Sequence, residues 1–301
     1  MKYITERKSQ IGATLLIIII SMVAVAVIGI AIYSMTFTAT LNQVVAQRAA
    51  KAFYLAESCV RIAASEYKAS ADKNATLVNL NNISFTMLNN QGSCSVKIYP
   101  YWFYARAAYA ACVTSITLYL PGEVPRVDEN DTTAITLPPN ANLKIKGATG
   151  AVAVYSSATV GSFNAASGGT SVTFTLSTPF LTAIVAGDEF YLGYNYTSSA
   201  TAPNAGGNLI LNIPLTDTND NTAKIFPSSK GSIFVESAGT ISQYSYDDRT
   251  IITTTSPHTV TLTNIQAVSG APAPTWPVTI SNTPIYMGKS LGLGSTSTYG
   301  D

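Results

Sequence analysis

Charged residues are scarce in this chain of 301 residues, and from Ser9 to Gln47 there are none. Asp, Glu, Lys and Arg make up 11% of the chain, against about 25% in an average soluble domain. Lys and Arg total 17, Asp and Glu total 16, and no basic run follows residue 8. Because a nucleic-acid binder needs a positively charged face, we expect no nucleic-acid partner.

The charge-free segment contains an apolar run from Ile11 to Tyr33, directly after Lys2, Arg7 and Lys8. As a helix, this run is long enough to cross a hydrocarbon core of about 30 Å, whereas a secretory signal has an apolar region of about 7–15 residues. The basic residues before it favour a cytoplasmic N-terminus. We therefore expect a single-pass protein of the inner membrane whose later residues form a periplasmic or extracellular head.

Histidine is almost absent, and this argues against an enzyme or a transition-metal site. His258 is the single histidine of the chain and follows Pro257, in a setting typical of a surface turn. One histidine and no C-x-x-C spacing offer neither a metal cluster nor a convincing catalytic triad. We expect no catalytic residues and no cofactor.

Cysteine occurs three times, which permits one disulfide in an oxidising compartment. Cys94 and Cys112 both lie in the β-rich part, and we expect them to pair. Cys59 lies on the helix predicted below and is the other candidate partner for Cys94. A third interpretation is that all three are buried free thiols that behave as small apolar residues.

Proline is absent before Pro100, so nothing stops a long N-terminal helix. From Val45 to Tyr67, apolar or small residues recur at the spacing of one helical face, with polar residues opposite. We predict a helix over residues 13–70, with an apolar membrane part at 13–38 and an amphipathic stalk at 39–70. Asp72 and Asn74 mark its end.

Two motifs in this region carry a family resemblance. The segment from Glu6 to Gly12, followed by the apolar run from Ala13 to Ile20, resembles the prepilin signal of type IV pilins and of the pseudopilins of type II secretion. The stretch Ala-Phe-Tyr-Leu-Ala-Glu-Ser at 52–58 is similar to one found in the helices of minor pilins. The resemblance covers about residues 1–68.

The resemblance implies a processing event and an assembly surface. Residues 1–12 would be a leader that a prepilin peptidase removes between Gly12 and Ala13, with methylation of the new N-terminus. Other pilin-like subunits would then bind the exposed helix. Its first residues after Ala13 are Thr14, Leu15, Leu16, Ile17 and Ile18.

One position departs from the pattern of the family. Major subunits usually carry a glutamate at the fifth position of the mature chain, where its charge pairs in the apolar filament core; this chain has Ile17 there. Because Ile17 cannot supply that charge, the resemblance favours a minor or tip-associated subunit.

The head, from Ile83 onward, changes to the alternating pattern of strands with one solvated face. We predict an α+β fold in which the long helix packs on a β-rich antiparallel head, which could divide into two small β-sandwich-like domains. The domains expected are a first β part at 71–128, packed on the helix, and a second at 129–301. Loosely similar patterns at 134–176 and 224–265 suggest a diverged duplication, although chance explains them equally well. The predicted strands are 93–99, 114–120, 143–146, 171–176, 232–235 and 259–263.

Three further segments have two interpretations each. Asp217, Asn219 and Asn221 place oxygen ligands at alternate positions, as in a calcium loop, but Thr222 and Ser228 replace its glycine and glutamate, so a polar turn also explains them. The aromatic run from Tyr99 to Tyr104 is either a core strand against the helix or a contact with a neighbouring subunit. The tail from Leu291 to Tyr299 is either disordered or ordered only in an assembly.

These expectations converge on a pilin-like structural subunit of a type IV pilus or a pseudopilus, displayed on a cell-surface filament after assembly. The alternative is an adhesin or binding module that never polymerises and uses the same helix only as an anchor.

Overall fold

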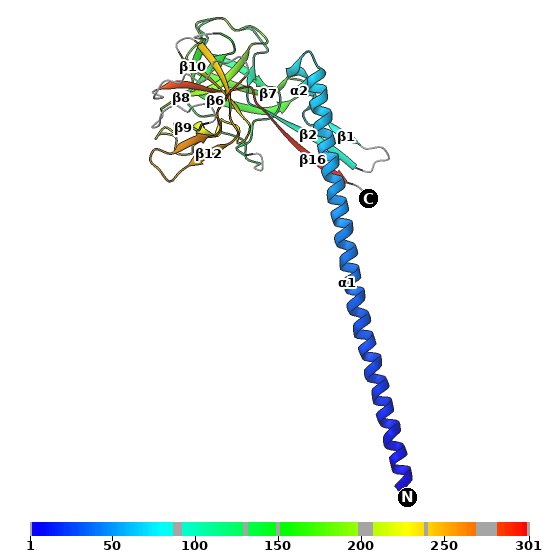
Figure 1. Ribbon diagram of the computed structural model, residues 1–301. Coiled ribbons are helices and arrows are strands. Elements are labelled where there is room, and N and C mark those ends of the chain that lie inside the picture. Colours follow the sequence, from blue (N-terminus) through cyan, green and yellow to red (C-terminus); the bar gives the residue numbers. More distant parts are fainter. Residues whose placement is uncertain are drawn as a thin grey trace.

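The computed structural model describes residues 2–86, 92–128, 132–148, 151–197, 207–237, 240–268 and 282–299, with side chains from residue 19 onward except at 237, 240, 296, 298 and 299. The fold is α+β, with one long N-terminal helix and a β-rich antiparallel head (Figure 1). The helix extends far beyond the head, and its N-terminus is the most distant point of the molecule (Figure 1).

The described elements are three helices and sixteen strands. The helices are α1 (Lys2–Ala69), α2 (Lys73–Leu80) and α3 (Asn221–Lys224). The strands are β1 (Ser84–Thr86), β2 (Gly92–Pro100), β3 (Phe103–Tyr104), β4 (Ser115–Leu120), β5 (Ala141–Ile145), β6 (Val152–Asn164), β7 (Gly169–Thr178), β8 (Glu189–Tyr196), β9 (Leu209–Asn212), β10 (Ser232–Ser237), β11 (Thr240–Ser245), β12 (Arg249–Ile252), β13 (Thr259–Leu262), β14 (Gln266–Ala267), β15 (Thr283–Met287) and β16 (Leu291–Tyr299).

Helix α1 is continuous over 68 residues, or about 100 Å at the helical rise. It passes through Gly12 and Gly29 without a break, because an isolated glycine costs a helix only about 1 kcal/mol. It is long and apolar enough to cross a membrane, by length and composition. It ends at Ala69, one residue before the predicted end. The Asp72 side chain then caps α2 by accepting a hydrogen bond from the Ala75 amide at 3.0 Å.

A small sheet of order β1-β2-β16 joins the helix to the head. Its centre, β2, pairs antiparallel with β16 without interruption from Leu291 opposite Pro100 to Tyr299 opposite Gly92. The second half of α1 packs on this sheet through Leu55, Cys59 and Ala63, which join one core with Val96, Ile98 and Trp102 of the β2 segment.

The structure corrects the expectation of a disordered tail, since that tail is strand β16. Gly292 and Gly294 lie against the Tyr99 side chain, where an added Cβ would come within 3.3 and 3.2 Å of it. Farther along, the Ser297 hydroxyl donates to the Ala52 carbonyl of α1 at 2.8 Å. Small residues therefore allow this strand to lie close to its neighbours, so their abundance does not signal disorder here.

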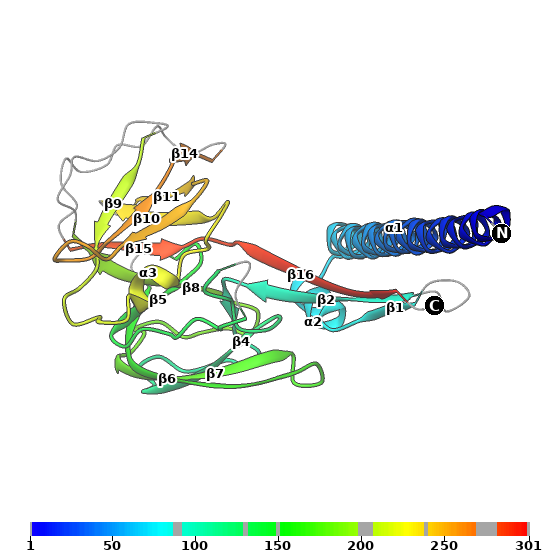
Figure 2. The ribbon, with the colours of Figure 1, turned by 90° about the horizontal axis from the view of Figure 1, so that it is seen from below.

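The large sheet has ten strands and closes partly on itself. Strands β8, β3, β4, β7, β6 and β5 are each paired with the next, and β5 pairs again with β8, so these six form a closed antiparallel ring. Strands β15, β10, β11 and β14 branch from β8. A third sheet, β12-β13-β9, shares the core of the ring and the branch. Figure 2 shows β10, β11 and β14 of the branch on one side of the head and β6 and β7 of the ring on the other.

All six predicted strands are present, as β2, β4, β5, β7, β10 and β13. The boundary expected near residue 128 does not coincide with a division between sheets, because β4 pairs with β7 and β2 pairs with β16. The suggested duplication is not repeated in the pairing either: β5, β6 and β7 form a meander, whereas β11 pairs with β10 and β14, and β13 belongs to the third sheet.

The expected Cys94–Cys112 pairing is wrong, and the other candidate is correct: Cys59 and Cys94 form a disulfide, with their Cα atoms 6.6 Å apart. Cys94 faces α1 from β2, and both residues are 2% exposed. Cys112 lies instead in an exposed turn before β4, where its amide donates to the Phe180 carbonyl. The spacing in sequence could not show that Cys94 faces the helix.

The aromatic run is buried, as the core interpretation predicted. Tyr99, Tyr101, Trp102 and Phe103 are each less than 8% exposed. Trp102 belongs to the core against α1, while Phe103 belongs to the core of the ring. The run therefore connects the two cores and presents little surface to a neighbouring subunit.

Candidate functional site

The most extensive candidate surface is the apolar half of α1, defined here as residues 19–45. Every side chain in this half is exposed, so the head covers no side of it. Hydroxyl groups of Thr36, Thr38 and Thr40 donate to carbonyls four residues earlier, at 2.8 to 2.9 Å, so these polar groups are satisfied within the helix. Exposed large apolar side chains run from Ile19 to Val45.

The second half of α1 has two different faces. Leu55, Cys59 and Ala63, each four residues apart, are buried against the small sheet. Phe53 and Tyr54 are about two-thirds exposed on the outside of the same helix. The sequence predicted a helix with an apolar part and a packed part, but the packed part begins near Ala52 and not at residue 39.

The predicted processing residues lie near the start of α1. Gly12, Ala13 and the segment from Thr14 to Ile18 have helical backbone. Their side chains lie outside the described part of the chain, so the structure places these residues only by their position in the helix, about 35 to 40 residues before Ala52, whose carbonyl accepts from Ser297 of the head.

The calcium candidate is organised by protein hydrogen bonds. The Asp217 carboxylate accepts from the amides of Asn221 and Thr222, at 3.0 and 2.6 Å. The Lys224 ammonium donates to the Asn219 carbonyl at 2.6 Å, so a positive charge of the protein already contacts this loop. Among the described residues there is no group of three or more His, Cys, Asp or Glu side chains that could hold a metal. The Asp217 side chain thus stabilises the turn before α3.

His258 is not an isolated surface residue. Its Nδ1 lies 2.8 Å from a carboxylate oxygen of Asp220, which is itself mostly buried. Both residues belong to the region around α3, and the pair holds the loop before β13 against that turn.

Residues 288–292 read Gly-Lys-Ser-Leu-Gly, the G-x-S-x-G pattern of a nucleophile elbow. The structural context is different, because this segment links strand β15 to strand β16 instead of leading from a strand into a helix. The Ser290 hydroxyl accepts from the Ser232 amide at 3.1 Å and contacts the Ser232 hydroxyl. Among the described residues, the hydrogen bonds of this hydroxyl join it to Ser232 and not to a histidine or a carboxylate.

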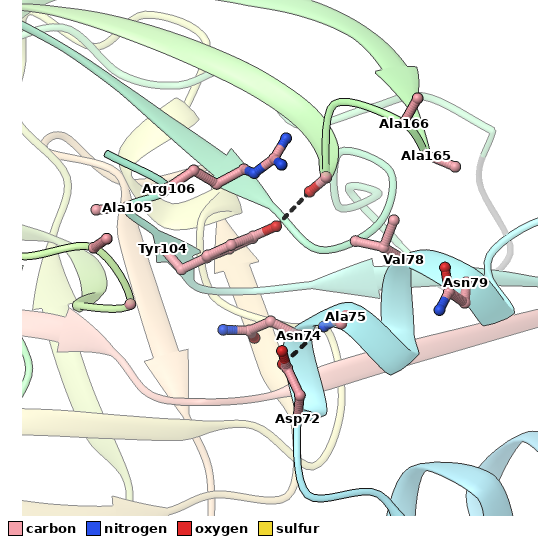
Figure 3. Close-up of a pocket in the computed structure, with 13 residues that line it drawn as sticks. Asp72, Asn74, Ala75, Val78, Asn79, Tyr104, Ala105, Arg106, Ala165 and Ala166 are labelled. Atoms are coloured by element: carbon pink, nitrogen blue, oxygen red, sulfur yellow. Dashed lines mark hydrogen bonds between the residues drawn. The ribbon is translucent and has the colours of Figure 1, made fainter. Parts of the chain in front are cut away.

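A cavity of about 510 Å³ lies between α2 and the head. One wall comes from α2 and its cap, with Asp72, Asn74 and Asn79 (Figure 3). The facing wall carries Tyr104 and Arg106, from the segment that follows Trp102 (Figure 3). The rest of the lining is small and comes mainly from the turns at 165–168 and 186–187: Ala75, Ala105, Ala165, Ala166, Gly168, Ala186 and Gly187, with Val78.

Several contacts fix the walls of this cavity. The side-chain oxygen of Asn74 accepts from the Trp102 indole at 3.2 Å, which leaves the side-chain NH₂ group of Asn74 free to donate. The Tyr104 hydroxyl donates to the Gly168 carbonyl at 2.6 Å. Gly168 has φ +85, and a Cβ there would lie within 2.8 Å of the Tyr104 hydroxyl and 2.7 Å of the Arg106 Cδ. Glycine thus allows the turn to approach both side chains.

Charge is distributed unevenly around the cavity. The Arg106 guanidinium lies 5.5 Å from the centroid of the Tyr119 ring and makes no hydrogen bond within the described residues. Burial raises the pKa of Tyr104; Arg106 opposes this effect, while Asp72 and Tyr119 add to it. Tyr104 is therefore a neutral phenol lying between a cation and an anion. No sequence motif could reveal this cavity, because its lining comes from segments that are distant in sequence.

Comparison of the chain with protein-family models, with curated proteins and with solved structures finds no match.

Proposed function

We propose that the chain is a pilin-like structural subunit of a type IV pilus or of a type II secretion-like pseudopilus. The observation that carries this proposal is the apolar half of α1, an uninterrupted helix without charge whose side chains are exposed on all sides. Such a surface must contact lipid before assembly and other apolar helices after it. The leader-like segment that ends at Gly12 supports the same function.

In this proposal the chain is first held in the inner membrane with its N-terminus cytoplasmic. A prepilin peptidase then cleaves between Gly12 and Ala13, and the exposed helix enters a filament at the cell surface. Ile17 favours a minor or tip-associated role, because it cannot supply the usual intersubunit charge. The β-rich head would be displayed outward and would have no catalytic role.

Mass spectrometry of the N-terminus tests this proposal. The protein is purified from its own cells and compared with the same protein from a strain that lacks the prepilin peptidase. We expect an N-terminus at Ala13, with a methyl group, that is absent in the mutant strain. An uncleaved N-terminus in both strains would contradict the proposal and leave a membrane-anchored adhesin or binding module.

A Gly12→Leu variant provides a second test of the proposed processing. Because a bulky side chain at the scissile position blocks access of the peptidase, we expect this variant to keep its leader and to be absent from filament fractions. A matched Gly29→Leu variant has open space around the substituted position, so it should be processed normally.

A further inference from the structure

The cavity between α2 and the head has the chemistry of a binding site, and it is independent of the assembly surface on α1. Its volume of about 510 Å³ lies within the range of small-molecule sites. A small number of polar groups converge on a lining that consists otherwise of alanine and glycine. We infer that this cavity binds an acidic sugar, that is, a sugar ring that carries one carboxylate and several hydroxyl groups.

The carboxylate would bind Arg106. The Arg106 guanidinium has five donor hydrogens and no hydrogen-bond acceptor among the described residues, and the Tyr119 ring supports it from one side. A planar carboxylate matches the fork of a guanidinium with two parallel hydrogen bonds. The free amide donors of Asn74 and Asn79 are uncharged, so Arg106 is the group that attracts an anion. One negative charge on the ligand is sufficient to pair with it.

The hydroxyl groups would bind the opposite wall. Asp72 only accepts hydrogen bonds, and one of its two carboxylate oxygens is used by the Ala75 amide. Asn74 and Asn79 can donate from their amide groups. A hydroxyl group donates and accepts at once, so it can bridge such a carboxylate and such an amide. The Tyr104 ring offers an apolar surface on which the C–H face of a sugar ring can pack.

Asp72 also decides between classes of anion. A phosphate would carry up to two negative charges into a cavity whose far wall already holds a carboxylate, and like charges repel there. A ligand with its single charge at the Arg106 end and neutral hydroxyls at the Asp72 end avoids this repulsion. An amino acid would place an ammonium group at Asp72, and it is therefore the main competitor in the test.

Isothermal titration of the full chain tests the inference. The protein is kept in lauryl dimethylamine oxide, because a detergent with a sugar head group could itself enter the cavity. The probes are glucuronate, trigalacturonate, glucose, acetate, alanine and inorganic phosphate. We expect saturable one-site binding of the two uronates, with little binding of glucose or acetate, since each of those provides only half of the required groups.

Three variants locate the site. Arg106→Gln should weaken uronate binding about tenfold or more, because it removes hydrogen bonds to a charged group. Ala166→Trp should abolish binding by filling the cavity, and Ala165→Trp serves the same purpose if that variant does not fold. Arg126→Gln is the matched control: this arginine also lies over a tyrosine ring, 4.6 Å from the Tyr99 centroid, but outside the cavity, so it should change nothing.

Uronate binding that is equal in the Arg106→Gln and Arg126→Gln proteins would overturn the assignment of the site. Absence of saturable uronate binding, or tighter binding of alanine or phosphate than of glucuronate, would overturn the assignment of the ligand. Binding of trigalacturonate but not of glucuronate would support the inference and indicate a polysaccharide instead of a free sugar acid. None of these outcomes depends on processing at Gly12, so the inference and the proposed function succeed or fail separately.

Discussion

At the scale of single residues, the disulfide between Cys59 and Cys94 ties α1 to the centre of the small sheet. It closes a loop with a sequence separation of 35 residues. A cross-link over such a loop lowers the entropy of the unfolded chain, and for this length the stabilisation is about 3–4 kcal/mol.

Replacement of Cys59 by alanine should therefore lower the free energy of unfolding by about 3–4 kcal/mol. Thermal unfolding of the head in detergent, followed by circular dichroism, measures the effect. Cys112→Ala is the control: this residue is exposed and unpaired, so it should leave the melting temperature unchanged. If the Cys112 variant were the destabilised one, the pairing described here would be wrong.

Glu189 is a second residue that connects separate parts of the head. It accepts from Lys146 at 2.7 Å and from Lys289, which lies in the link between β15 and β16. Lys289 also lies 4.8 Å from the centroid of the Trp102 ring. Burial alone would raise the pKa of Glu189, but the hydrogen bonds and charges of the two lysines outweigh it, so the pKa lies below its ordinary value of 4.5.

A carboxylate whose pKa is lower in the folded state stabilises the fold above its unfolded pKa and loses this contribution as the pH falls. We thus expect Glu189→Gln to reduce the free energy of unfolding at pH 7 by about 1.5–3 kcal/mol. The difference from the unmodified protein should shrink as the pH is lowered from about 4.5 through the folded pKa. Urea unfolding at pH 7 and at pH 3 measures it, and a difference that grows in acid would contradict the assignment.

At the scale of elements, β16 shows most clearly where sequence and structure diverge. A sequence of glycine, serine and threonine predicts a flexible tail, yet it forms the longest uninterrupted pairing of the small sheet. Composition could not predict this, because what stabilises β16 is its pairing with β2 together with its contact with the adjacent helix.

Deletion of residues 291–301 should consequently destabilise the small sheet. The nine residues that pair with β2 would be lost, and with them the contact of Ser297 with α1. We expect faster hydrogen exchange at the amides of residues 93–99 and a lower melting temperature. Ser297→Ala, which removes only one hydrogen bond, should cost about 1 kcal/mol and leave the exchange of β2 nearly unchanged. Unaltered exchange in the truncated protein would restore the expectation of a dispensable tail.

The periodic signals predicted α1 and six of the sixteen described strands, and they did not predict the pairing. The helix and six strands follow from local patterns that each segment carries in itself. Neither the closed ring nor the choice of Cys59 as partner for Cys94 follows, because both depend on which faces meet after folding. The sequence could not predict the cavity beside α2 for the same reason, because Asp72, Arg106 and Gly168 are distant in sequence and meet only after folding.

At the scale of the whole molecule, the chain divides into a packed head and a helix whose apolar half lies outside the head. Side chains 19–51 are exposed, and among the described side chains of α1, which begin at residue 19, the first buried one is Leu55. The apolar half therefore contributes nothing to the core of the head.

Removal of residues 1–45 should release the protein from the membrane fraction while changing the free energy of unfolding by less than about 0.5 kcal/mol. Removal of residues 1–60 also deletes Leu55 and Cys59, so it should destabilise the head by several kcal/mol. Cell fractionation and thermal unfolding of the two truncated proteins separate these effects. A large loss of stability in the shorter truncation would show that the apolar half supports the head after all.

The position of the disulfide also determines how the molecule would respond to a pull. Tension applied between the far end of α1 and the head passes from Cys59 directly to Cys94 and then along β2. Three elements lie outside this path and carry no tension: the last turns of α1, helix α2 and strand β1. Residues 60–93 have an extended length of roughly 120 Å, and force cannot extend them while the disulfide is intact. A subunit that is held at one end and pulled at the other would therefore lengthen little before its head unfolds.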